Sequence, residues 1–141
     1  MFLSHRFLAL FTFLIVSVRV NAVPMTSDYG SLVNRAILYV SSYAGQIQSL
    51  KLSQSNGAYS LASLGSNYGC AANASWLTLN DNTEVLYCVN EALNGGNGSL
   101  SSYSLGAPGS GTLKQKGNLT ILGGGVNSAL FNNDNSLVVS H

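Results

Sequence analysis

The chain has 141 residues, only 8 % of them charged, with six Lys or Arg against five Asp or Glu and a formal net charge of +1. So few cations exclude the basic surface that nucleic-acid binding requires. The charged fraction lies far below the ~25 % of an average soluble domain, so Ser, Asn, Thr and Gly, or attached sugar, must keep the protein in solution.

Residues 1–22 have the pattern of a secretory signal peptide. Arg6 supplies the positive start, Phe7–Val18 is almost wholly apolar, and Val20-Asn21-Ala22 fits the small-x-small cleavage pattern. The apolar run is too short to span a bilayer, which needs roughly 20 residues. We therefore expect a secreted, extracellular protein without membrane association once the chain is cleaved before Val23.

The remainder divides into a lead-in segment, residues 23–35, and a series of short strands, residues 36–141. β-Branched, aromatic and alternating residues, separated by Gly, Asn and Ser, predict three strands in a first unit and four in a second, with the last one broken near Gly117. No stretch after the signal has helical spacing. The predicted strands are 36–43, 46–52, 58–64, 75–79, 84–90, 99–105 and 112–122, followed by 127–131 and the start of another at 137.

One strand sequence recurs along this series. Ile37–Tyr43 returns as Val85–Glu91, an offset of 48 (38 to 86), and its start returns as Leu137–His141, an offset of 51 (86 to 137). The stretch 76–82 returns as 128–134, an offset of 52. Four short strands per unit with a period near 50 are typical of β-propeller blades, although a β-sandwich also has short strands and frequent turns.

We therefore predict an all-β fold, a partial β-propeller of about two blades plus the start of a third. A blade cannot bury both of its faces alone. Residues 36–141 would then be the N-terminal blades of a truncated ring, and the missing C-terminal blades would be their partners.

Two cysteines, Cys70 and Cys88, are candidates for a disulfide in a secreted chain. Cys88 also occupies the repeat position of Val40 and Val139, where a free cysteine serves as a small buried hydrophobe, so the sequence leaves the pairing open. Two Cys and the single His of the mature chain form no ligand cluster, and the sequence indicates neither a metal nor another cofactor.

Three N-glycosylation sequons follow the signal peptide, at Asn73, Asn97 and Asn118. Asn97 and Asn118 are expected to be modified before Asn73. The Gly123–Gly125 run does not predict a phosphate loop, because neither Lys-Ser/Thr nor a helix follows it.

From Asn73–Asn82 followed by Val85–Glu91, the chain resembles the seven-bladed lactonase family. That family includes 6-phosphogluconolactonases of the cycloisomerase type and carboxy-cis,cis-muconate cyclases, and the chain is most similar to their secreted fungal relatives, from about Ile37 to His141. The resemblance implies that strands 75–79 and 127–131 line the central channel. It also implies that the first unit has only its second to fourth strands, because relatives supply the inner one from the far C-terminus.

The resemblance implies an extracellular lactonase that acts on a sugar or muconate-type lactone by general acid/base catalysis. Relatives use His, Arg and Glu around the channel mouth, including a His that begins an inner strand. Here Ser75 and Asn127 begin the inner strands and are candidates for substrate binding, while Glu91 and His141 end second strands and are candidates for catalysis. Glu91 can also be an ordinary solvated strand-end carboxylate. A non-catalytic secreted propeller that binds glycans or protein, and an inactive truncated product, are the alternatives.

Overall fold

The structure, a computed structural model, describes residues 14–19 and 35–141. Its described residues form ten strands in three antiparallel sheets, which confirms the predicted all-β fold. The predicted cleavage site and residues 23–34 of the lead-in lie outside the described residues.

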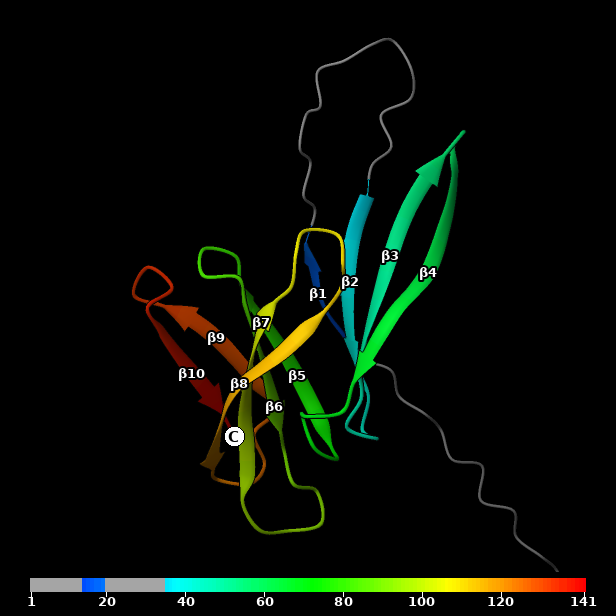
Figure 1. Ribbon diagram of the computed structural model, residues 1–141. Coiled ribbons are helices and arrows are strands. Elements are labelled where there is room, and N and C mark those ends of the chain that lie inside the picture. The colour runs from blue at the N-terminus through cyan, green and yellow to red at the C-terminus, as the bar shows by residue number, and fades with distance from the viewer. Residues whose placement is uncertain (1–13, 20–34) are drawn as a thin grey trace, which may run out of the picture.

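Three sheets stand side by side (Figure 1). Each is built in sequence order, strand next to strand, and antiparallel neighbours can be joined by short turns. The first sheet contains β1 (Leu14–Arg19), β2 (Arg35–Ser41), β3 (Ile47–Ser55) and β4 (Ala58–Asn67). The second contains β5 (Ala74–Asn80), β6 (Val85–Asn90), β7 (Gly98–Leu105) and β8 (Leu113–Ile121), and the third contains β9 (Asn127–Phe131) and β10 (Ser136–Ser140).

The first sheet has four strands, so the expectation of only three was wrong. Leu14–Arg19, which we assigned to the signal peptide, pairs with β2, and β1 lies beside β5 as β5 lies beside β9. The physical reason is that β2 would otherwise present unpaired N–H and C=O groups along its edge, and a stretch rich in Ile and Val pairs readily with such an edge. Removal of residues 1–22 as a signal peptide stays a prediction.

Two details of the strands differ from the sequence analysis. β8 does not break near Gly117, because a register shift opposite Ser102 and Tyr103 absorbs one extra residue as a bulge. The inner strands correspond at an offset of 51 instead of 52, since Leu79 pairs with Leu86 and Leu130 pairs with Leu137. The inner strand therefore repeats at the same interval as the second strand.

The main hydrophobic core lies between the first and second sheets. Alternate residues of neighbouring strands point to one face, and in both sheets that face is apolar. Burying these side chains against one another is what joins the two sheets. The core contains Tyr39, Ile47, Cys70, Ala74, Leu77, Leu86, Cys88 and Tyr103, with Ile37, Leu79, Leu105 and Leu113 packed around it.

Polar side chains join the second sheet to the third. Thr78 Oγ1 donates to the Ser128 carbonyl oxygen over 2.9 Å and lies 2.7 Å from the Ser128 hydroxyl. Further along, Asn80 Nδ2 donates to the Asp134 carbonyl oxygen over 2.9 Å, and Asn82 Nδ2 donates to Asp134 Oδ2 over 2.8 Å. The inner strands of two consecutive sheets are thus fixed side by side.

The two outer faces of this stack are apolar and exposed. Tyr59 and Leu61 project from the first sheet on the side away from the core, and Phe131 and Val138 project from the third sheet away from Ser128. Sheets that bury one face and present a second apolar face are what a radial stack of blades requires.

Candidate functional site

Four loops meet at the end of the stack where the inner strand β5 begins and the second strand β6 ends, the lower end in Figure 1. They connect β2 to β3, β4 to β5, β6 to β7 and β8 to β9. We call this end the Glu91 rim and define it by Tyr43, Asn73, Glu91, Gly123–Gly125 and His141.

A chain of hydrogen bonds crosses the Glu91 rim from the first sheet to the third. Asn73 N donates to the Tyr43 carbonyl oxygen (2.8 Å), and Glu91 N donates to the Asn73 carbonyl oxygen (3.1 Å). Gly124 N donates to the Glu91 carbonyl oxygen (2.7 Å). The backbone of Glu91 is therefore held from both sides, which places its side chain on a rigid support.

The Glu91 side chain is buried, with 6 % of the residue exposed. Its Oε1 is enclosed and has no hydrogen-bond partner. Beside it stands Tyr43, which is 48 % exposed. A hydrogen bond to Glu91 raises the pKa of the Tyr43 hydroxyl, and burial and the negative charge of Glu91 raise it further. The solvated strand-end carboxylate that the sequence allowed is not what the structure shows.

His141 and Asn127 lie at the same rim. His141 Nδ1 donates to the Gly123 carbonyl oxygen over 3.1 Å, which leaves Nε2 to accept a proton. Asn127 begins β9, is exposed and pairs with Ser140. The loop Gly123–Gly125 thus contacts both residues proposed for catalysis, Glu91 through Gly124 and His141 through Gly123.

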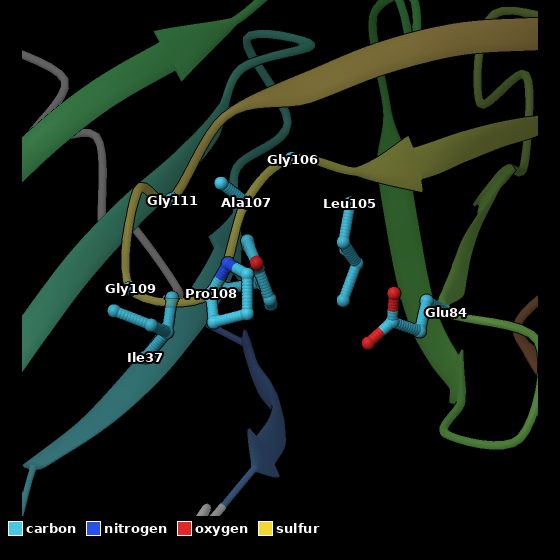
Figure 2. Close-up of a pocket in the computed structure, with 9 residues that line it drawn as sticks. Ile37, Glu84, Leu105, Gly106, Ala107, Pro108, Gly109 and Gly111 are labelled. Atoms are coloured by element: carbon cyan, nitrogen blue, oxygen red, sulfur yellow. The ribbon is translucent and has the colours of Figure 1, made fainter.

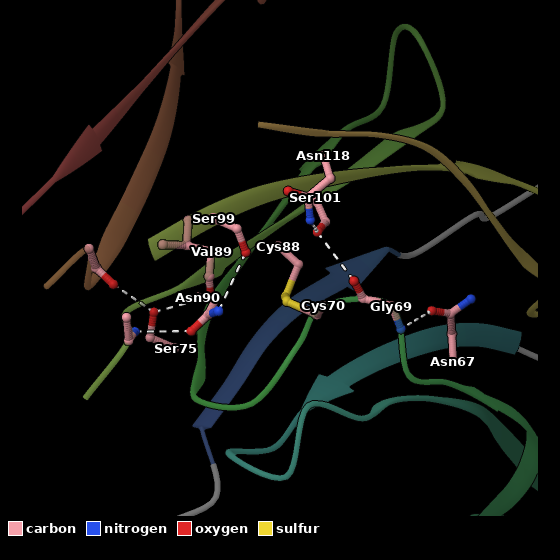
Figure 3. Close-up of a disulfide and its surroundings, with 12 residues drawn as sticks. Asn67, Gly69, Cys70, Ser75, Cys88, Val89, Asn90, Ser99, Ser101 and Asn118 are labelled. Atoms are coloured by element: carbon pink, nitrogen blue, oxygen red, sulfur yellow. Dashed lines mark hydrogen bonds between the residues drawn. A yellow bond between two sulfur atoms is a disulfide. The ribbon is translucent and has the colours of Figure 1, made fainter. Parts of the chain in front are cut away.

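Ser75 is placed differently from Asn127. It is buried, and its hydroxyl lies 2.8 Å from the Gly125 carbonyl oxygen and 3.2 Å from the Val89 carbonyl oxygen (Figure 3). Because both acceptors belong to the protein, this position suits a structural link between the second and third sheets rather than a contact with substrate.

Cys70 and Cys88 form a disulfide in the structure (Figure 3). Their α-carbons are 5.9 Å apart, within the usual range for such a bond, and both residues are fully buried in the core between the first two sheets. The bond ties the β4–β5 loop to β6. It therefore anchors the loop that carries Asn73 to the Glu91 rim.

The three sequons have different surroundings. Asn97 lies exposed in the β6–β7 loop. Asn118 is exposed on β8, but its amide nitrogen donates to the Ser101 hydroxyl over 2.9 Å. Asn73 is half-buried, and the serine of its sequon, Ser75, is buried. Glycosylation of any of them stays a prediction, and these surroundings make Asn97 the most accessible acceptor.

Two cavities lie away from this rim, between the first and second sheets. One, of about 40 Å³, is lined by Ile37, Tyr39, Glu84 and residues 105–109 and 111 (Figure 2). The other, of about 170 Å³, lies between β4 and the Gly111–Leu113 stretch. Both are smaller than the ~300–1,000 Å³ of ordinary small-molecule sites, so we do not assign a substrate to either.

The family model described as "Lactonase, 7-bladed beta-propeller" matches residues 37–140. The chain belongs to the seven-bladed β-propeller lactonase family. Comparison with curated proteins and with solved structures gave no significant match. In the ranges 14–19 and 35–141, no helix has the length and apolarity needed to cross a membrane.

Within this lactonase propeller, the sequence analysis missed Tyr43. The signal was present in the repeat, because Ile37–Tyr43 returns as Val85–Glu91 and Tyr43 therefore occupies the same repeat position as Glu91. Equivalent positions of consecutive blades lie at the same rim of a propeller. Comparing the last residue of each repeat, as well as the apolar residues, would have selected both Tyr43 and Glu91.

Gly123→Ala is expected to lower the free energy of unfolding of this lactonase propeller by about 1–3 kcal/mol, the usual cost of overpacking. A β-carbon at Gly123 would overlap the Gly96 carbonyl oxygen, so two loops of the Glu91 rim would have to separate. Urea unfolding measures the loss, and amide shifts of Glu91 and His141 report the displacement. Gly65→Ala is the control, since nothing lies within 4 Å of its added carbon; equal effects of the two substitutions would contradict the close approach.

Proposed function

We propose that this lactonase propeller is an extracellular enzyme that opens or closes a sugar or muconate-type lactone at the Glu91 rim. The observation that carries the proposal is that Glu91 and His141, which end strands of different sheets, both hydrogen-bond to the loop Gly123–Gly125. An extracellular location is supported by the signal pattern of residues 1–22 and by a buried disulfide, a bond typical of secreted proteins.

Lactone hydrolysis needs a proton acceptor and then a proton donor. His141 Nε2 is the acceptor: it takes a proton from water as the water oxygen bonds to the lactone carbonyl carbon. The same nitrogen returns that proton to the ring oxygen as the carbon–oxygen bond breaks, which gives the open hydroxy acid. Glu91, fixed through its backbone and buried, contacts the substrate beside the reacting bond.

A second candidate is a secreted propeller that binds glycans or protein without turnover. The specific observation in its favour is Ser75, whose hydroxyl bonds to two backbone carbonyl oxygens, at a position where the family resemblance implies a His. Under this alternative the Glu91 rim binds a ligand but performs no proton transfer.

The test is acid release from D-glucono-1,5-lactone and from muconolactone by the full chain, corrected for the spontaneous reaction. We expect turnover of at least one lactone. His141→Gln should lower kcat/KM by about 100-fold or more, the usual share of an acid/base group, and Glu91→Gln should lower it by about tenfold or more through the lost substrate contact. Glu84→Gln, a glutamate at the other end of β6, is the matched control and should have no effect. Binding of lactone with no turnover would favour the binding propeller.

A further inference from the structure

Tyr43 and Glu91 face each other across the boundary between the first and second sheets. Asn73 lies between them, because its N–H bonds to the Tyr43 carbonyl oxygen and its carbonyl oxygen accepts from Glu91 N. Gly45, in the loop that carries Tyr43, packs so closely on the Ala71 carbonyl that an added β-carbon would stand 2.6 Å from its oxygen. The backbones that carry the two side chains are therefore held at a fixed separation.

The Glu91 carboxylate is incompletely satisfied. Its Oε1 is enclosed without a donor, although the residue is more than nine-tenths buried. A buried charged oxygen without a hydrogen bond is costly, so a group that brings a donor to it is stabilised. Oε1 can therefore accept a hydrogen bond that the described residues do not supply.

The Tyr43 side chain stands beside the Glu91 carboxylate. About half of the residue is exposed, and exposed side chains generally change rotamer rapidly. Its phenol is the hydrogen-bond donor to the carboxylate, and this bond is the main cause of the raised pKa of the hydroxyl. Movement of the ring would open Glu91 to a ligand while the loop backbones stay in place.

We propose that Tyr43 and Glu91 form a subsite for the hydroxyl groups of a neutral sugar lactone. Glu91 accepts a hydrogen bond from a ligand hydroxyl, and Tyr43 is a positioning residue that orients the carboxylate. This inference rests on the proposed function and narrows its substrate class. A muconate-type lactone or a phosphorylated sugar would bring a second negative charge to Glu91, and like charges placed together disfavour binding.

The experiment compares the affinity of the full chain for a neutral probe, D-galactono-1,4-lactone, and an anionic one, muconolactone, by calorimetry. We expect the neutral lactone to bind at least tenfold more tightly. Glu91→Gln should weaken its binding roughly tenfold or more, as loss of a hydrogen bond to a charged group does, whereas Glu84→Gln should leave it unchanged. Tighter binding of the anionic lactone, or an unchanged affinity in Glu91→Gln, would overturn the proposal.

If Glu91→Gln impairs folding, Tyr43→Phe is the second variant to test. Tyr43 is half exposed, so its substitution should leave the fold intact. Tyr43→Phe should weaken binding of the neutral lactone several-fold. In a turnover assay it should raise KM and leave kcat unchanged. Ultraviolet titration of the phenols supplies a direct readout: the transition that disappears in Tyr43→Phe belongs to Tyr43, and it should move to lower pH in Glu91→Gln. An unmoved transition, or an equal fall in kcat, would contradict the positioning role.

The two proposals fail in different ways. Tight binding that depends on Glu91 but gives no turnover would refute the lactonase activity and support the subsite. Turnover that falls in His141→Gln but is insensitive to Glu91→Gln and Tyr43→Phe would support lactonase activity through His141, refute the subsite and remove Glu91 from the site.

Discussion

Replacing Cys70 and Cys88 together by alanine is expected to lower the free energy of unfolding by about 3 kcal/mol. This is the usual effect of removing a disulfide that closes a loop of this length. The two residues are 18 apart in the sequence, and both are fully buried between the first two sheets. The bond closes the chain from the β4–β5 loop to β6, so its loss frees the loop that holds Asn73 against Tyr43 and Glu91.

Urea unfolding of the oxidised chain and of the Cys70→Ala/Cys88→Ala variant measures this difference. The reduced and unmodified chain is the control, because it keeps both side chains and loses only the cross-link. Proteolysis within residues 67–73 should increase in both reduced and substituted protein. A variant as stable as the oxidised chain would show that the two sheets are held together without the bond.

Leu86→Ala is expected to cost about 2–5 kcal/mol, the range for removing a large buried side chain and leaving a cavity. Leu86 is 0 % exposed and lies at the centre of the core between the first and second sheets, where the backbone of β6 has neighbours on both sides. Because β6 is hydrogen-bonded to a strand on each side, it cannot easily move inward to fill the cavity. The cavity should therefore persist, and the loss in free energy of unfolding should lie in the upper half of the range.

Leu119→Ala is the matched control for this substitution. The substitution at Leu119, on β8, removes the same side-chain volume. Because Leu119 is 61 % exposed, the free energy of unfolding should change by no more than about 0.5 kcal/mol. Comparing the urea midpoints of unfolding of the two variants isolates the contribution of burial at Leu86 to stability. Equal losses would mean that the apolar face of β6 is not buried against the first sheet.

The fold could be predicted from the sequence because the strands repeat. The recurrence of Ile37–Tyr43 as Val85–Glu91 located β2 and β6. The stretches after each of them alternate clearly enough to give β3 and β4, and then β7, to within a few residues. Ends were less accurate, since β4 continues to Asn67 beyond the predicted residue 64, where its pairing with β3 supports polar residues that lack strand periodicity.

The pairing of β1 could not be predicted, because it depends on an open edge of β2 and not on the sequence of Leu14–Arg19. The apolar pattern of that stretch fits a signal peptide and a strand equally well. Similarly, the equal apolar character of Cys88 and Val40 left the disulfide open. Cys70 lies three residues after Asn67, in a loop that folds back over β7 and brings it to Cys88. This long-range placement, which the sequence does not show, allows the disulfide.

At the candidate site, sequence reasoning located the residues but not their surroundings. Glu91 and His141 followed from their places at strand ends, whereas the burial of Glu91 did not. The loop Gly123–Gly125, which joins the second sheet to the third, approaches the Glu91 backbone from a distant part of the sequence. The glycines serve that approach, since a β-carbon at Gly125 would stand 3.0 Å from Val89. No local pattern around Glu91 contains this information.

The central claim is that consecutive sheets stack face against face as the blades of a propeller, and methyl NOE spectroscopy of the full chain tests it most directly. Val89 and Val139, on the second and third sheets, both adjoin Gly125, at 3.0 and 3.2 Å from the position of its added β-carbon. The account predicts an NOE between their methyl groups and none between Leu61 and Val138, which lie on opposite outer faces. An NOE between Leu61 and Val138, without one between Val89 and Val139, would show that the first and third sheets close on each other as a sandwich.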